Sequence, residues 1–299
     1  MSDTASSLDP GGVLPVRELP ARFWGSVGAG ALGAAWQTFK DLVKRPFYEI
    51  YLRRLRALAH TWSHPRHLGI IMDGNRRFAR QIGFASALLG HHRGAEKLKE
   101  VLRWCSDLGV PVVTVWCFSI DNFQRSTEEV EGLLRLFEDQ AREMADSDQV
   151  HRHQVRVRFI GRLELLPESL RQEIRRVEDA TAGYDKLQLN VAMAYGGREE
   201  IADAFRRYMK DHLRPGADLD EVLGGIDGAA LDPYLYTSGQ PEPDLILRTS
   251  GEIRLSGFLL WQSCHCEFYF CDTNWPAFRE IDFLRALRSY DERQRRFGR

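Results

Sequence analysis

The residues best suited to chemistry form a short run that begins at Asp73, where an apolar segment ends. Gly74 and Asn75 read as a turn, and Arg76 and Arg77 open a helical pattern. A backbone that enters a helix through a glycine exposes N–H groups, which attract anions. A carboxylate in the same place can hold Mg²⁺ against phosphate oxygens. The run therefore predicts either a magnesium-dependent phosphate site or a plain strand-to-helix turn that Asp73 caps.

Two later segments carry polar groups after apolar runs. Residues 119–125 read Ser-Ile-Asp-Asn-Phe-Gln-Arg, although a helix entry capped at 126–127 also explains them. Residues 248–262 place Arg248 and Arg254 on either side of a Thr-Ser-Gly turn. Two guanidinium groups can clamp a diphosphate, whereas the alternative is a surface salt-bridge cluster. Together with the first run, these segments predict two adjacent sites for anionic substrates.

The elements that must position these residues alternate between strand and helix. Apolar, β-branched segments predict strands at His67–Met72, Val112–Phe118, Val155–Ile160, Leu187–Ala192, Asp244–Leu247 and Glu267–Phe270. Helical patterns lie between them, at Ala95–Leu108, Thr127–Ala145, Glu168–Ala180, Glu199–Leu213 and Phe278–Phe297. This alternation predicts a single α/β domain with a central, mostly parallel sheet covered by helices. Such sheets bind ligands at the carboxyl ends of their strands, where the three polar segments fall.

The composition is that of a globular protein, because 43% of the 299 residues are hydrophobic and can form a sizeable core. The formal net charge of -1 gives no general attraction to nucleic acid, and no such partner is expected. Five cysteines, an odd number, favour free thiols in a reducing compartment. The CxC spacing of Cys264 and Cys266 disfavours a zinc site. With no signal peptide or membrane span in the sequence, we expect a cytoplasmic protein.

The first 60 residues differ in character from the rest. Residues 1–20 are rich in Ser, Asp, Gly and Pro, which predicts a disordered leader. Residues 21–60 predict a helical extension, which is basic and amphipathic in its second half and in which Pro46 kinks a helix or starts a second one. Such a helix suits either peripheral contact with an anionic membrane or packing on the body of the protein. Residues 61–299 would then form the main domain.

Taken together, these motifs resemble those of the cis-prenyltransferases, the Z-isoprenyl diphosphate synthases that include undecaprenyl and dehydrodolichyl diphosphate synthases. The resemblance runs from about His67 to Gly298. It rests on motifs in the right order, which are Asp73-Gly-Asn-x-Arg77, Gly90-His91, Phe118-Ser-x-x-Asn122-x-x-Arg125, Asn190 with Tyr195-Gly-Gly-Arg198, and Arg248 through Gln262. It implies that residues 61–299 are a catalytic domain in which a parallel sheet and its helices enclose an apolar product tunnel.

The same resemblance implies a reaction. A Mg²⁺-dependent transferase would condense isopentenyl diphosphate with an allylic diphosphate, such as farnesyl or geranyl diphosphate, and give a Z-polyprenyl diphosphate. The alternatives are a short-chain synthase of the Z-farnesyl type and a non-catalytic subunit that activates a partner. The chain lacks the paired aspartate-rich motifs of trans-prenyltransferases, which supports the cis reaction.

The resemblance also implies roles for particular residues. Asp73 would hold Mg²⁺ and assist departure of the allylic diphosphate, Glu267 would give a second metal contact, and Asn122 would receive or relay a proton. The allylic substrate would bind Gly74, Asn75, Arg76, Arg77 and His91, with its isoprenoid tail starting against Phe78. The mobile loop over the site would contain Ser119, Ile120, Asp121, Asn122, Phe123 and Arg125. Isopentenyl diphosphate would bind Arg248, Arg254, Leu255 and Ser256.

Other features bear on assembly and product length. The tail with Arg296 and Gly298 resembles one that reaches the partner's substrate phosphates, which predicts a self-sufficient homodimer. Many family members carry an Arg midway between the first motif and Gly-His, where this chain reads Phe84 to Leu89, and Arg80 or Arg93 would have to replace it. Cys117 is small enough to permit elongation, whereas Glu138, Asp139 and Gln140 either interrupt the tunnel wall or face solvent. A polyprenyl product is slightly favoured over a short one.

Overall fold

The structure, a computed structural model, describes residues 48–294. The predicted leader, the extension up to residue 47 and the tail with Arg296 and Gly298 lie outside the described residues. Residues 48–59 form a helix, in keeping with the helical pattern read there. From Arg54 onwards the chain groups into one compact unit, which contains the sheet.

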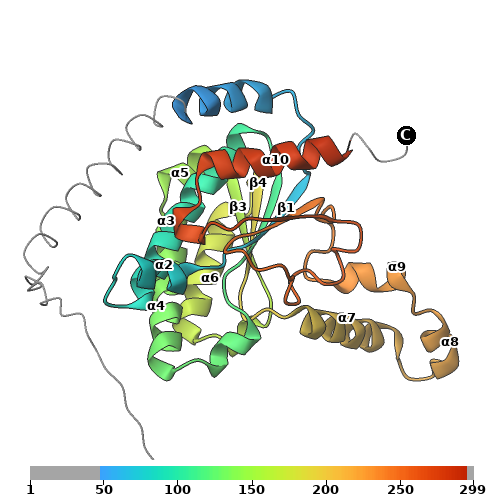
Figure 1. The fold of residues 1–299 in the computed structure, drawn as a ribbon. Helices are drawn as coiled ribbons and strands as arrows, with labels where there is room; N and C mark the ends of the chain where they lie inside the picture. Colours follow the sequence, from blue (N-terminus) through green and yellow to red (C-terminus); the bar gives the residue numbers. More distant parts are fainter. Residues whose placement is uncertain (1–47, 295–299) are drawn as a thin grey trace, which may run out of the picture. The chain divides into compact units, whose positions relative to one another are not determined.

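Six parallel strands form a single sheet in the order β3-β4-β2-β1-β5-β6 (Figure 1). The predicted α/β class is therefore confirmed. Strand β1 lies in the interior of the sheet, between β2 and β5. Beyond β2 the sheet continues to the edge strand β3, and beyond β5 it continues to the edge strand β6. The strands are β1 (His67–Ile71), β2 (Val112–Trp116), β3 (Val155–Ile160), β4 (Leu187–Ala192), β5 (Leu245–Arg248) and β6 (Glu267–Phe270).

Helices connect the strands and cover the sheet. One of them, α3, begins at Ala87 rather than at the predicted Ala95, because Ser86 caps it by accepting a hydrogen bond from the backbone N–H of Leu88 at 3.2 Å. A short 3₁₀ helix, η1 (Ile120–Gln124), follows β2. The α-helices are α2 (Asn75–Gln81), α3 (Ala87–Asp107), α4 (Thr127–Ala145), α5 (Asp148–Arg152), α6 (Glu168–Thr181), α7 (Gly197–His212), α8 (Leu219–Gly224), α9 (Gly228–Leu231) and α10 (Glu280–Gln294).

The two faces of the sheet are packed differently. On the first face, alternate strand residues such as Leu68 and Ile70 join α3, α4, α6 and α10 in a large apolar core. Figure 1 shows α3, α4 and α6 together on one side of the sheet. On the second face, Ile71 and Ile246 pack in a smaller cluster with Phe258. Because successive strand residues point to opposite faces, each strand contributes to both layers.

Buried polar groups crosslink the second face. His67 Nε2 lies 2.7 Å from Thr114 Oγ1, and Asn190 Nδ2 donates to the same hydroxyl at 2.9 Å. A second network centres on Glu200, whose carboxylate accepts hydrogen bonds from Tyr195 Oη at 2.5 Å and Gln262 Nε2 at 2.9 Å. Asn190, Tyr195 and Gln262 belong to the motifs of the family resemblance, and the structure assigns all three to the support of the sheet.

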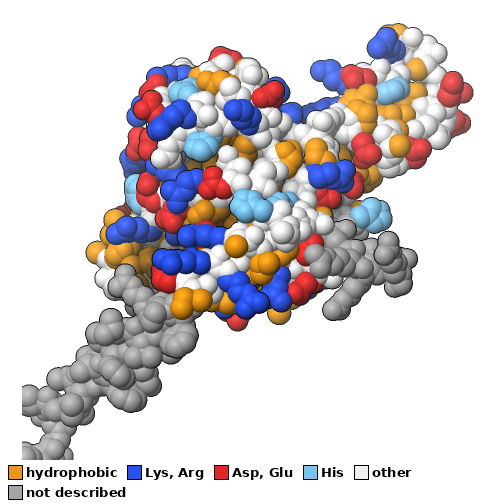
Figure 2. Space-filling model, turned by 90° about the horizontal axis from the view of Figure 1, so that it is seen from above, with side chains coloured by type: hydrophobic (Ala, Val, Ile, Leu, Met, Phe, Trp, Pro, Cys, Tyr) orange, Lys and Arg blue, Asp and Glu red, His pale blue; other side chains and the backbone are white. Residues whose placement is uncertain are grey.

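The described surface is mixed in charge. Figure 2 shows basic and acidic side chains interspersed over the face seen from above. Such interspersion avoids a large field of one sign on that face. None of the described helices combines the length and the apolar character that a membrane span requires.

Candidate active site

Asp73 and Arg248 face each other where β1 and β5 end. Arg248 Nη2 donates to Asp73 Oδ2 at 2.9 Å, and the backbone N–H of Gly74 donates to Oδ1 at 2.7 Å. Thr249 Oγ1 donates to the backbone carbonyl of Asp73 at 2.7 Å, which ties the two strand ends together. The Arg248 side chain is only 5% exposed, and its Nε has no hydrogen-bond partner. A buried guanidinium with a free N–H beside a partly exposed carboxylate is suited to binding an anion with its counter-ion.

The position of this pair follows from the sheet topology. Strand β5 lies parallel to β1 on the side opposite to β2, and the register pairs Ile71 with Arg248. In open α/β sheets, ligands bind at such a point, beyond the carboxyl ends of the strands. The sequence prediction that the first and third polar segments would lie side by side is therefore confirmed.

The turn between β1 and α2 depends on close packing. Gly74 has a φ of 101°, in the left-handed region that glycine favours. Asn75 Nδ2 donates to the backbone carbonyl of Met72 at 3.0 Å. A Cβ atom at Gly90 would lie 2.2 Å from the carbonyl oxygen of Asn75, and one at Gly94 would lie 2.3 Å from its Oδ1. Asn75 therefore fixes the turn against α3, and the two glycines of α3 allow the approach.

The loop after β5 folds over Arg77. Arg77 Nη1 donates to the carbonyl of Ser250 at 2.7 Å, and Nη2 donates to Glu252 Oε1 at 2.6 Å. Glu252 also pairs with Arg254, whose carbonyl accepts a hydrogen bond from Arg248. Ser250 has a φ of 81°, which is strained for a residue with a side chain and is typical of functional loops. One carboxylate thus links the arginines predicted to bind the two diphosphates.

The loop after β2 is held by its own side chains. Asn122 Oδ1 accepts a hydrogen bond from the backbone N–H of Ser119 at 3.1 Å. The backbone of Ser119 also forms an isolated parallel β-bridge with that of Tyr195. Phe123 packs edge to face on Phe118, with ring centroids 4.9 Å apart. The amide oxygen of Asn122 is therefore engaged in holding the loop, and Phe123 belongs to the apolar core.

Basic groups from three elements surround the site. Arg125 contacts Glu129 at 2.9 Å, and Arg76 lies 3.8 Å from the same carboxylate. Burial, followed by repulsion from Arg125 and Arg76, lowers the pKa of His91 to about 4. Its Nε2 is buried and has no hydrogen-bond partner. His91 is neutral at pH 7 and retains one ring nitrogen for a ligand.

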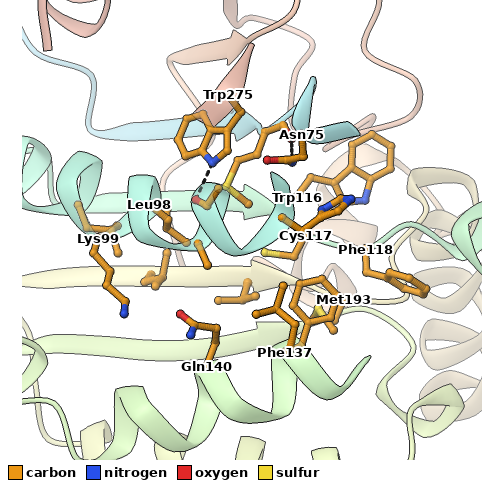
Figure 3. Close-up of a pocket in the computed structure, with 18 of the residues that line it drawn as sticks. Asn75, Leu98, Lys99, Trp116, Cys117, Phe118, Phe137, Gln140, Met193 and Trp275 are labelled. Atoms are coloured by element: carbon orange, nitrogen blue, oxygen red, sulfur yellow. Dashed lines mark hydrogen bonds between the residues drawn. The ribbon is translucent and has the colours of Figure 1, made fainter. Parts of the chain in front are cut away.

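A cavity of about 400 Å³ leads away from these polar groups. It runs between α3 and α4 on one side and the first face of the sheet on the other (Figure 3). Val150 and His153 also line it. Its walls are mainly apolar along this length. They include Leu98, Leu102, Cys117, Phe137, Val157, Leu189, Val191 and Met193. A charged mouth followed by an apolar interior suits a molecule with an anionic head and a hydrocarbon tail.

The cavity brings ten of the twenty predicted site residues together. Those that line it are Asp73, Gly74, Asn75, Arg76, Arg77, His91, Ser119, Asn122, Arg125 and Arg248. Arg80 lines it as well and Arg93 does not, which favours Arg80 as the replacement for the family's missing arginine. Arg254 and Ser256 lie outside the lining but contact Arg248, the latter through Ser256 Oγ at 3.1 Å.

Other predicted residues are not brought to the cavity. Phe78 packs against Phe84, with ring centroids 6.2 Å apart, and does not line the cavity, so its predicted contact with the isoprenoid tail is not supported. Leu255 packs in the second-face cluster. Asp121 is exposed, and Ile120 does not line the cavity.

Glu267 requires a correction. It is the first residue of β6, and β6 runs parallel to β5 with Phe270 opposite Arg248. Glu267 therefore lies toward the amino ends of the strands, away from Asp73, where it pairs with Arg293 at 2.7 Å. Within one chain, the structure does not place Glu267 beside Asp73, so a second metal contact from Glu267 of the same chain is not supported.

Sequence reasoning missed three acidic partners. Glu252 lies between Arg248 and Arg254 in the sequence, and its negative charge was the signal that could have indicated an ion pair with an arginine. Glu129 lies in the first turn of α4, four residues after Arg125, which precedes that helix. Glu143 pairs with Lys99, 44 residues away in the chain, and no local pattern indicates such a contact.

The donor set at the mouth of the cavity fits Mg²⁺ in the presence of a diphosphate. Among residues 48–294, no cluster of three or more His, Cys, Asp and Glu side chains could hold a metal alone. The Asp73 side chain is 30% exposed and lines the cavity. Mg²⁺ commonly takes one or two carboxylates, several waters and substrate phosphate oxygens. Asp73 and a bound diphosphate supply that set.

Comparison with known proteins agrees with this geometry. The family model described as "Putative undecaprenyl diphosphate synthase" matches residues 71–298. An isoprenyl transferase of Thermus thermophilus is 52% identical over 257 residues, which are 86% of this chain and 97% of the relative. A (2Z,6E)-farnesyl diphosphate synthase of Thermobifida fusca is 49% identical over 257 residues, which are 86% of this chain and 99% of the relative.

A solved structure shares the fold. Lavandulyl diphosphate synthase from Lavandula x intermedia, in complex with dimethylallyl diphosphate, has a TM-score of 0.69 and 35% sequence identity, covering 76% of this chain and 95% of that one. The family-model match extends from the last residue of β1 past α10 and so includes the whole site. Relatives this similar over most of their length show that the chain belongs to the cis-prenyltransferase family.

Proposed function

We propose that this chain is a Mg²⁺-dependent cis-prenyltransferase that condenses isopentenyl diphosphate with an allylic diphosphate, such as farnesyl or geranyl diphosphate. The observation that carries the proposal is the Asp73–Arg248 pair, 2.9 Å apart, at the mouth of an apolar cavity of about 400 Å³. The cavity would take the hydrocarbon, and the charged mouth would take the two diphosphates.

Each diphosphate would have its own group of donors. Arg76, Arg77 and His91 would hold the allylic diphosphate at the mouth, and Arg248 and Arg254 would hold isopentenyl diphosphate beside it. The guanidinium groups of Arg77 and Arg248 now donate to the carbonyls of Ser250 and Arg254. Substrate phosphate oxygens would replace these neutral acceptors, because hydrogen bonds between ionised groups are stronger.

Cleavage of the allylic C–O bond places new negative charge on the departing diphosphate. Groups that are already aimed at that charge lower the barrier most effectively. Asp73 would hold Mg²⁺ against the diphosphate, and the metal ion would neutralise part of the developing charge. The apolar walls keep water away from the reacting carbon atoms, which favours condensation over hydrolysis.

Asn122 fits a positioning role better than proton transfer. Its amide oxygen already accepts the Ser119 N–H, and a neutral amide is a poor base. The side chain would instead hold the loop after β2 beside the allylic diphosphate, with Arg125 extending toward it. The mobility predicted for this loop remains a proposal.

A short-chain Z-prenyl diphosphate synthase is the second candidate. Polar side chains, Lys99 and Gln140, line the far part of the cavity and interrupt its apolar wall. A synthase that stops early needs such an end to the hydrocarbon site. We also infer that the chain works as a homodimer, a state that light scattering of the purified protein would test directly.

The reaction is tested with purified protein, Mg²⁺ and labelled isopentenyl diphosphate, offered separately with dimethylallyl, geranyl and farnesyl diphosphates. We expect labelled products with at least one primer, resolved by chain length. Asp73→Asn should lower kcat about 100- to 1,000-fold, as expected when a group that stabilises transition-state charge is removed. Asp107→Asn, an exposed carboxylate at the end of α3, is the matched control and should retain activity. Absence of product with every primer would overturn the proposal.

A further inference from the structure

Polar side chains cross the cavity at its far part. Lys99 of α3 and Gln140 of α4 both point into the cavity from opposite walls (Figure 3). Glu143, one helical turn beyond Gln140, lines the same part. No catalytic or phosphate-binding role accounts for these three residues, because they lie beyond the apolar walls that separate them from Asp73.

These side chains form one connected network. Lys99 Nζ donates to Glu143 Oε1 at 2.6 Å and to Glu96 Oε1 at 2.9 Å, and Gln140 Nε2 donates to Glu143 Oε2 at 3.1 Å. Partial burial opposes the charge on Lys99, but the hydrogen bonds that it donates to both carboxylates raise its pKa above the ordinary value. Of the ion pairs among the described residues, only Lys99–Glu143 joins α3 to α4.

The network also reaches the surface. A second hollow, on the outer side of α3 and α5, shares Lys99, Glu143, Ser147 and Gln149 with the main cavity. The side chains of Lys99 and Glu143 are 33% and 54% exposed, so water reaches the pair from outside. The ion pair therefore lies between the cavity and this outer hollow.

We propose that the Lys99–Glu143 ion pair is the gate at which the hydrocarbon tail of the growing product stops, so that it sets the product length. The inference rests on the proposed function, since only an elongating tail would reach this depth. Wall residues before the gate are apolar and accept each added isoprene unit. At the gate, the tail would have to displace water from an ammonium group and a carboxylate, which is unfavourable for charged groups.

The gate need not stabilise the fold. Ion pairs with this exposure contribute little to stability, because water and salt screen them. Removal of the pair should therefore leave the fold intact and change only the end of the hydrocarbon site. This separation makes product length the informative measurement.

The test compares product lengths from purified variants under the assay conditions given above. Lys99→Met/Glu143→Met replaces the pair by apolar side chains of similar length, and we expect its main product to be at least one isoprene unit longer than that of the unchanged protein. Lys99→Glu/Glu143→Lys restores the pair with its charges exchanged, and we expect the original product length. Lys99→Met alone should lengthen the product in the same direction and provides a milder change if the double variant folds poorly.

The matched control is Lys97→Met/Glu100→Met, which removes another α3 ion pair, 2.8 Å long, that does not line the cavity. It should leave the product distribution unchanged. The inference is overturned if the methionine variants give the original length, or if the exchanged pair gives products as long as theirs. If the unchanged protein forms no product at all, the proposed function fails instead, and the two failures are thus distinguishable.

Discussion

The two faces of the sheet are formed by the same six strands but differ in what packs against them. On the first face, α3 and α4 leave a cavity of about 400 Å³ against the strands. On the second face, buried hydrogen-bond networks around Thr114 and Glu200 join the strands to the segments that cover them. The first face can accept material of variable length, whereas the second holds the loop with Arg248 in one arrangement.

This difference indicates where the chain tolerates change. A cavity wall gains or loses atoms with little strain, because space is already present. A buried polar network has no such freedom, since each unpaired donor or acceptor is left without water. Substitutions on the two faces should therefore differ in both size and kind of effect.

The largest effect is expected at Glu200, on the second face. Glu200→Ala would leave the buried Tyr195 Oη and the backbone N–H of Tyr236 without an acceptor, and would remove one of the two acceptors of Gln262 Nε2. We expect the free energy of unfolding to fall by about 4 kcal/mol, measured by urea denaturation, because each lost partner costs roughly 1–3 kcal/mol and the losses overlap. Glu200→Gln retains an acceptor oxygen and should lose about half as much. An equal loss in both variants would show that the network is not the cause.

A pH effect of intermediate size is expected from His67, also on the second face. Burial lowers the pKa of His67 to about 4, although a hydrogen bond with the carbonyl of Pro241 and the charge of Asp244 oppose the shift. The unfolded chain binds a proton near pH 6.5 and the folded chain does not, so stability is lost as the pH falls from about 6.5 toward 4. The loss should reach about 3 kcal/mol, since one pKa unit corresponds to roughly 1.4 kcal/mol. Unfolding measured at several pH values on His67→Gln should show a flatter profile than the unchanged protein.

The smallest changes in stability are expected from two substitutions that add atoms, one on each face of the sheet. A Cβ at Gly69, on the second face, would lie 2.9 Å from Ile246 Cγ1 and 3.1 Å from the Phe258 ring. Gly69→Ala should therefore destabilise by about 1–3 kcal/mol, the usual range for overpacking. Cys117→Phe fills existing space in the cavity, and we expect a change below about 1.5 kcal/mol together with a shorter product. Equal destabilisation by Gly69→Ala and Cys117→Phe would show that the two faces do not differ in their tolerance of added atoms.

Much of the fold could be predicted from local sequence. All six strands were predicted, and the inner strands such as β1 and β2 stand out because they are apolar runs buried on both faces. The beginning of α3 was not, since its first turns contain Gly90 and Gly94, which weaken the helical pattern. The structure explains these glycines by the close approach of Asn75, a contact that local sequence does not contain.

The candidate site was predictable where a motif lies at a strand end. Asp73 and Arg248 were placed correctly because each follows a recognisable strand. Glu267 does not lie beside Asp73 within one chain, because the family resemblance supplies a residue but not the edge of the sheet on which it lies. The Lys99–Glu143 gate was not predicted, since it joins two helices through side chains far apart in the chain.

The order of the strands also has a consequence for biosynthesis. Asp73 and Arg248 are 175 residues apart, and within residues 48–294 β5 is the strand that pairs with the side of β1 opposite to β2. During synthesis on the ribosome, one side of β1 has unpaired backbone N–H and C=O groups until β5 has emerged. Such edges can pair with other chains. Release of a chain truncated before Leu245 would therefore yield an inactive, aggregation-prone fragment, even though four of the six strands had already been made.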